Sequence, residues 1–155
     1  MTQGELTQTR SFIVDVNSLV ASCSVEAING VQYGFTLNAS DYYESNNKGI
    51  DYSYALCKVN IIGDGASRMY VDCINYAESN YDYGILSTLD KTLTKDYNAD
   101  ATNVFKSFKG AQSASIQTVD YGVIPEGEHY IYIKFIKDSS QHHNNDTLQF
   151  KVRFE

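Results

Sequence analysis

Two acidic side chains, Glu78 and Asp82, lie four residues apart in the stretch NYAESNYDYGILSTLD at residues 75–90. Residues four apart on a strand share a face, so the two carboxylates could form the pair that glycoside hydrolysis needs, roughly 5–10 Å apart across a cleft. However, the chain has no tryptophan to form a sugar platform and no Gly-x-Ser-x-Gly nucleophile motif. We therefore predict that the protein is not an enzyme.

Four acidic residues lie near the ends of expected strands, where they could converge at one end of a sandwich. Calcium takes about six to eight oxygen ligands, which loops of this kind supply. The candidate ligands of a structural calcium ion are Glu78, Asp82, Asp138 and Asp146. In the alternative, Lys137 and the amides of Asn144 and Asn145 satisfy these carboxylates without an ion. We expect no other cofactor.

The histidines and cysteines are not spaced as zinc ligands. The stretch HHNND at 142–146 offers adjacent histidines without a suitable third soft ligand, so we interpret it as a solvated hairpin tip. The three cysteines, Cys23, Cys57 and Cys73, are expected to be buried reduced thiols. Cys57 and Cys73 lie on strand-like runs beside apolar neighbours, and a bridge between these two is left open.

Tyrosine is abundant, with 13 tyrosines and 7 phenylalanines in the chain. A tyrosine ring offers a large contact face and a hydroxyl at low conformational cost, which suits a protein interface or a sugar platform. Tyr130 and Tyr132 alternate with Ile131 and Ile133, so they should face away from the core as an outward ridge. We favour an interface over a sugar platform. The candidate binding residues are Tyr42, Tyr43, Asn46, Tyr81, Tyr130 and Tyr132.

Bulk composition excludes several classes of protein. The chain has 155 residues, a net charge of −7 and 43% apolar residues, which fit one folded acidic domain. An acidic chain gains nothing from counterion release, so nucleic acid is not an expected partner. No run approaches membrane-spanning length and no signal peptide can be read in residues 1–11.

Period-two alternation dominates the pattern of apolar residues. In TLQFKVRF at 147–154, every second residue is apolar, which is typical of a half-buried strand. Turn signals such as NG at 29–30 and GDGAS at 63–67 separate most of the runs. The expected strands are 11–20, 31–37, 54–62, 68–76, 81–89, 115–121, 129–137 and 147–154.

Eight short strands separated by turn signals predict an all-β fold. We expect an antiparallel jelly-roll β-sandwich that forms a single domain over residues 11–155. We expect residues 1–10 to form an N-terminal arm that the sandwich does not need. Residues 87–108 place Leu89 and Leu93 four apart but are rich in threonine and asparagine. We interpret them as a long surface loop with at most one helical turn.

The order of several motifs resembles that of concanavalin-like jelly-roll modules, including MAM-type and bacterial surface jelly rolls. This resemblance covers about residues 31–154. The same motifs also resemble segments of structural proteins of tailed bacteriophages and of surface proteins of gut Firmicutes. The motifs are YYESNNKGIDYSYALCKV at 42–59, INYAESNYDYGILSTLD at 74–90, VFKSFKG at 104–110, IPEGEHYIYIKFIKDSS at 124–140 and NDTLQFKVRF at 145–154.

This resemblance implies a non-catalytic structural or attachment module of a tailed-phage virion, as an accessory head, fibre or tail-associated protein. It would be assembled in the host cytoplasm and would bind other virion proteins or a host glycan, as an oligomer or part of an assembly. The alternative is a carbohydrate-binding or adhesion module of a bacterial surface protein. A calcium-dependent fragment of a glycan hydrolase is a third, less favoured class.

Overall fold

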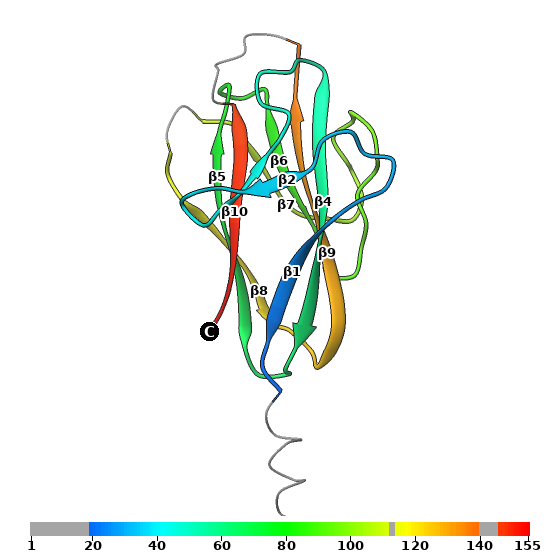
Figure 1. The fold of residues 1–155 in the computed structure, drawn as a ribbon, viewed down its shortest axis with the longest axis vertical. Coiled ribbons are helices and arrows are strands. Elements are labelled where there is room, and N and C mark those ends of the chain that lie inside the picture. Colours follow the sequence, from blue (N-terminus) through cyan, green and yellow to red (C-terminus); the bar gives the residue numbers. More distant parts are fainter. Residues whose placement is uncertain (1–18, 112–113, 140–145) are drawn as a thin grey trace, which may run out of the picture.

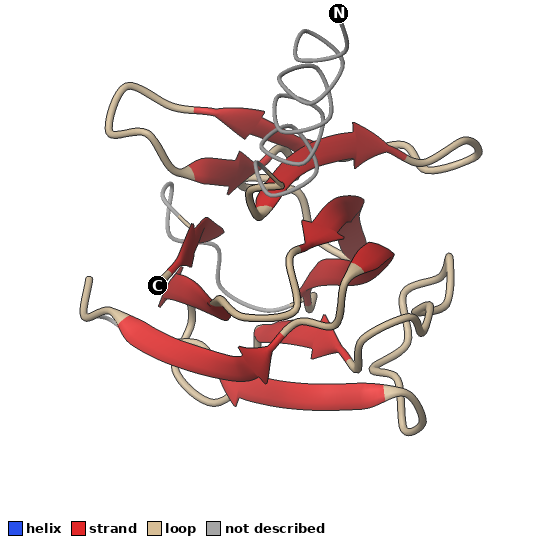
Figure 2. Cartoon of the chain, turned by 90° about the horizontal axis from the view of Figure 1, so that it is seen from below, coloured by secondary structure: helices blue, strands red, loops and turns tan. Residues whose placement is uncertain are grey.

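The computed structural model describes residues 19–111, 114–139 and 146–155, which form ten strands and no helix. Strands and loops make up all of this part of the chain (Figure 2), so it holds no helix that could cross a membrane. Figure 1 shows the strands, which are β1 (Ser22–Ala27), β2 (Phe35–Leu37), β3 (Tyr43–Ser45), β4 (Ser53–Gly63), β5 (Arg68–Tyr76), β6 (Tyr83–Ser87), β7 (Val104–Lys109), β8 (Gln117–Val123), β9 (Gly127–Lys137) and β10 (Thr147–Phe154).

The described strands pair into two five-stranded antiparallel sheets, in the orders β1-β4-β9-β6-β7 and β2-β3-β10-β5-β8. From β3 to β10, the chain changes sheet at every step except that from β6 to β7. The resulting orders, β3-β10-β5-β8 and β4-β9-β6-β7, are those of a two-sheet jelly roll. β1 and β2 add to this eight-stranded frame. The predicted all-β antiparallel jelly-roll sandwich is therefore confirmed.

Alternate residues of the long strands build the interior between the sheets. On β9, Ile131, Ile133 and Phe135 are fully buried, as the period-two pattern predicts. Phe150 of β10 meets them from the other sheet and stacks on Tyr43, with 5.5 Å between the ring centroids. This interior fixes the register of the strands whose ends carry the acidic residues.

A second layer covers the outer face of the sheet that contains β9. The loop of residues 88–103, between β6 and β7, packs Leu93 against Leu56, Ile85 and Ile136 in a separate buried cluster. Because both faces of this sheet are covered, the sequences of β4 and β9 are apolar at most positions rather than at every second one.

Six expected strands correspond to β4, β5, β6, β8, β9 and β10, and the end of a seventh forms β2. The expected strand at 11–20 and the arm at 1–10 fall wholly or mostly outside the described residues. β1 and β3 were not predicted. The expectation that all of residues 87–108 form a loop is wrong at its end, because residues 104–108 belong to β7, which pairs with β6 along an edge.

All three cysteines are free thiols. Cys57 and Cys73 are buried on the inner faces of opposite sheets, and burial raises the pKa of both thiols. The structure therefore has no bridge between them. Cys23 on β1 is exposed, contrary to the expected burial.

Candidate functional site

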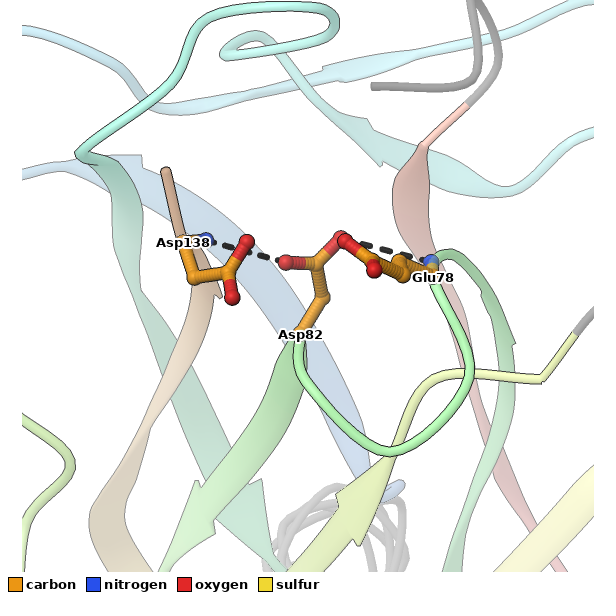
Figure 3. Close-up of side chains that lie close together, drawn as sticks. All are labelled: Glu78, Asp82 and Asp138. Atoms are coloured by element: carbon orange, nitrogen blue, oxygen red, sulfur yellow. Dashed lines mark hydrogen bonds between the residues drawn. The ribbon is translucent and has the colours of Figure 1, made fainter. Parts of the chain in front are cut away.

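The four acidic residues singled out as calcium ligands meet at one end of the sandwich. Glu78 follows β5, Asp82 precedes β6, Asp138 follows β9 and Asp146 precedes β10. Side-chain oxygens of the first three lie within 4.8 Å of one another (Figure 3). Asp146 is connected to Asp82 through the ammonium group of Lys137. The topology thus brings these residues together, as the sequence indicated.

Asp82 is the fully buried centre of this acidic cluster. One carboxylate oxygen accepts a hydrogen bond from the backbone N–H of Asp138 at 2.9 Å, and the other accepts from the N–H of Glu78 at 3.3 Å (Figure 3). The side chain therefore fastens the end of β9 to the turn that connects β5 with β6. Charge-assisted bonds of this kind are stronger than neutral ones.

The turn before Asp82 has its own local constraints. Asn80 adopts a φ of 71°, a left-handed conformation that asparagine tolerates better than most residues. Gly110 donates its N–H to the Asp82 carbonyl at 2.7 Å, and a Cβ on Gly110 would lie 2.5 Å from the Glu78 carbonyl oxygen. Residue 110 must therefore be glycine for the turn to pack this closely against the chain that follows β7.

Lys137 provides a positive charge within the cluster. Its side chain is fully buried, and its Nζ lies 3.1 Å from Asp146, 3.6 Å from Asp51 and 3.9 Å from Asp82. Burial alone would lower the pKa of Lys137, but these carboxylates outweigh it, so the pKa is raised and the ammonium form is favoured. The contact with Asp146 is an ion pair without an aligned hydrogen bond.

Burial dominates the electrostatics of Asp82. Removal from water raises its pKa to about 6, although the Asp138 N–H and the Lys137 ammonium act in the opposite direction. The negative charge of Asp146 adds to the increase. Asp82 therefore titrates closer to neutrality than an ordinary aspartate does.

The arrangement supports the expected role of Lys137 in satisfying the acids within the protein, whereas Asn144 and Asn145 lie outside the described residues. Lys137 neutralises part of the charge of Asp82 and Asp146, and backbone N–H groups occupy both oxygens of Asp82. Glu78 and Asp82 are both buried, so this carboxylate pair is not presented to an open cleft. Calcium binding by Glu78, Asp82 and Asp138 stays a prediction, because their oxygens are close enough to share an ion.

Tyrosine rings surround this end of the sandwich. Tyr52 and Tyr81 are exposed, at 69% and 57% of their surface, and the Tyr52 ring lies 5.4 Å from that of Tyr97. The N–H of Tyr52 donates to the carbonyl of Asp138, which itself bonds to Asp82, the residue after Tyr81. Tyr52 and Tyr81 therefore belong to one connected end, which we name the acidic loop end (residues 50–52, 78–82 and 138).

The other candidate binding residues are dispersed. Tyr43 is half-buried against the core, and Tyr42 lies beside the ammonium of Lys151, 6.0 Å from the ring centroid. Asn46 is exposed and accepts a hydrogen bond from the hydroxyl of Thr36 at 3.0 Å. These three residues lie on or beside β3, in the sheet opposite the one that holds Tyr130 and Tyr132. The structure therefore does not unite the candidates in one binding surface.

Tyr130 and Tyr132 face away from the main core, as predicted, but they do not form a free ridge. Both are half-buried, and the Tyr130 hydroxyl donates to the backbone carbonyl of Asp90 at 2.9 Å. The Asp90 carboxylate in turn accepts from the Tyr130 N–H and contacts His129 at 2.8 Å. These contacts hold the start of the 88–103 loop, and Tyr132 packs against the second buried cluster.

Lys134 is a second buried lysine, on the opposite face of β9 from Lys137. Its ammonium lies 2.8–3.2 Å from four oxygens of the 88–103 loop, two of Thr94, the Asn98 carbonyl and an Asp100 carboxylate oxygen. The side chain is fully buried, although Lys134 belongs to the same outward row of β9 as Tyr130 and Tyr132. It anchors the loop that covers the sheet.

No family model, curated protein or solved structure matches this chain.

Proposed function

We propose that the protein is a non-catalytic attachment module that uses its acidic loop end to recognise a protein partner. The observation that carries this proposal is the exposure of Ile50, Tyr52 and Tyr81 around a buried, cross-braced acidic cluster. Large exposed apolar patches on soluble proteins mark interaction sites. Tyrosine is also among the residues enriched at binding interfaces.

The jelly-roll frame suits such a role because it holds these loops at fixed positions. Asp82 braces two loops through backbone hydrogen bonds, so less conformational freedom is lost on binding. The setting that we propose is a tailed-phage virion, in which the module is an accessory head, fibre or tail-associated protein. This setting rests on the resemblance of the motif order to segments of phage structural proteins.

The test is attachment to particles and purified virion proteins. Tyr52→Ala combined with Tyr81→Ala should weaken attachment at least about tenfold, since central aromatic residues often carry much of the binding energy. Phe105→Ala is the matched control, because Phe105 is an exposed aromatic residue on β7, outside the acidic loop end. Equal attachment by the wild type and the double variant would contradict the proposal.

A carbohydrate-binding or adhesion role on a bacterial surface is the second candidate. The pairing of the Tyr52 and Tyr97 rings near Asp51 and Asp138, two acids that are not fully buried, favours it, because aromatic faces and polar groups together bind sugars. Binding on a glycan array that is lost in the double tyrosine variant, without any effect on particle attachment, would select this role over the first.

A further inference from the structure

One side of the sandwich is open along β1. This strand is the outer member of its sheet, and none of the described strands pairs with its other edge. The side chains of Cys23, Val25 and Ala27 lie on the inner face of β1. Val25 is half-buried, and the other two residues are exposed. The opposite sheet offers only the three-residue strands β2 and β3 at this side. The inner face of β1 is therefore left partly uncovered.

The uncovered face is hollowed into a groove. Two cavities of about 170 Å³ and 400 Å³ share Val25 and Tyr43 in their walls, so they follow one another along β1. Phe35 lines the larger cavity and Leu37 the smaller, and Leu37 is half exposed. We name this feature the β1 groove. The apolar side chains of Val25, Phe35 and Leu37 along the groove, together with the free backbone edge of β1, fit an added β-strand with one apolar row.

A segment of matching pattern precedes β1 in the sequence. Residues 11–18, SFIVDVNS, lie outside the described residues. In their sequence, every second residue from Phe12 to Val16 is apolar. Phe12, Val14 and Val16 form one apolar row, as a strand with one buried face requires. As a strand, eight residues would extend over about 27 Å, enough to follow the whole of β1. The segment joins the described chain at Leu19, close to the Cys23 end of the groove.

The connection to β1 does not favour a return of this segment onto its own domain. Only Leu19, Val20 and Ala21 separate it from Ser22, and a tight hairpin prefers Gly, Asn or Asp at positions of positive φ. Leu19 and Val20 are also exposed rather than packed on the domain. A neighbouring molecule is the more accessible acceptor.

We propose that residues 11–18 of a second copy of this chain add as a strand to the free edge of β1, with Phe12, Val14 and Val16 turned into the β1 groove. Because the donor segment and the groove are different surfaces, the contact is head-to-tail and can extend into linear assemblies. The proposal does not depend on the proposed attachment function, because the acidic loop end lies where β5 and β9 end, at the opposite end of the sandwich from the start of β1 (Figure 1).

Disulfide trapping tests the pairing directly, since Cys23 is an exposed thiol that lines the groove, whereas Cys57 and Cys73 are buried. Val14→Cys or Val16→Cys, under mild oxidation, should give disulfide-linked dimers and longer species that disappear when Cys23→Ser is added. Ile13→Cys and Asp15→Cys are matched controls on the other row and should link much less. Linkage within one chain, or equal or absent linkage in all four variants, would overturn the proposal.

Sedimentation tests the groove without altering the donor segment. Leu37→Asp should weaken self-association of the full chain at least about tenfold, because it places a charge in the apolar groove. Val123→Asp, at a similarly exposed residue on β8, adds the same charge elsewhere and should leave association unchanged. A wild type that stays monomeric at all concentrations, or a Leu37→Asp variant that assembles normally with an unchanged circular dichroism spectrum, would contradict the proposal.

Discussion

Two lysines on β9, only three residues apart, are both fully buried but serve different parts of the structure. Lys134 lies on the outer face, where its ammonium is held by two backbone carbonyls, a hydroxyl and a carboxylate oxygen of one loop. Lys137 lies between the sheets and meets three carboxylates from three different segments. Lys134 therefore holds one loop mainly through hydrogen bonds to neutral oxygens, whereas Lys137 balances the negative charge of carboxylates where several strand ends meet.

The difference predicts how each region responds to loss of its cation. A buried ion pair contributes little net stability compared with apolar residues, but removal of one partner leaves an uncompensated charge. At Lys137 the remaining groups are Asp82 and Asp146, both fully buried. At Lys134 the remaining carboxylates are Asp100, which is almost buried, and Asp96, which is exposed.

Lys137→Met should have the largest effect. We expect it to lower the free energy of unfolding by about 3–5 kcal/mol, because Asp82 and Asp146 lose their shared cation inside the protein. Urea unfolding followed by circular dichroism measures this change. Addition of Asp146→Asn to the same chain should restore part of the loss, and a double variant less stable than Lys137→Met would contradict the charge-balance account.

Lys134→Met should cost less, about 1.5–3 kcal/mol, the usual contribution of hydrogen bonds to a charged group. The loop can move into water once its anchor is lost, so the damage should be local. Hydrogen exchange should accelerate in residues 90–103 more than in β5 or β10. Uniform acceleration over both sheets would show that the loop is integral to the main core instead.

The pH dependence of the free energy of unfolding should reveal the raised pKa of Asp82. Its pKa is raised in the folded state to about 6, from 3.8, so the folded protein binds more protons than the unfolded chain between these values. The contribution of Asp82 to stability is therefore greatest at low pH and is lost as the pH rises to about 6, by roughly 1–3 kcal/mol. Other acids, such as Asp72 and Asp120, have lowered pKa values and act in the opposite direction.

The difference between the wild type and Asp82→Asn isolates this contribution. Its measurement requires unfolding curves for both proteins from pH 4 to pH 7. We expect the stability advantage of the wild type to shrink as the pH rises, whereas a constant difference would mean that Asp82 titrates as an ordinary aspartate.

The smallest expected effect is that of a chelator. If Lys137 is the cation of the acidic cluster, removal of divalent metal should shift the melting midpoint by less than about 2 °C, under 1 kcal/mol for a domain of this size. A fall of more than about 10 °C on chelation, reversed by calcium, would show that Glu78, Asp82 and Asp138 bind an ion beside Lys137.

The sequence predicted the long strands well because their patterns are strong. In β10, the alternation of Leu148, Phe150 and Val152 with polar residues leaves little choice of face. β3 has only three residues, and β7 follows a segment rich in threonine and asparagine, so neither shows a comparable pattern. Short strands of this kind are fixed by their neighbours rather than by local preference.

At the candidate site, sequence reasoning found the acids and offered Lys137 as their counter-charge, but it missed that Lys134 and Lys137 are fully buried. Lysine is rarely buried, so composition favours solvated positions for Lys134 and Lys137. Their burial depends on loops that meet only in the folded chain. Tyr52 and Tyr97 were missed because they lie in turns. The DYNAD pattern at 96–100, with oxygen donors at alternate positions, was the available signal for a loop that encloses a cation.

The central place of β10 in its sheet has a consequence for the order of folding. This strand lies between β3 and β5, and the Leu148 N–H donates to the Ser45 hydroxyl across 103 residues of chain. Strands β3 and β5 therefore stay separated until residues 147–154 insert between them. Loop closure over such distances is slow, so we expect folding on a timescale of milliseconds to seconds. During that interval the Phe150 site would be open, and a chaperone or a partner subunit would meet a sheet with a missing middle strand.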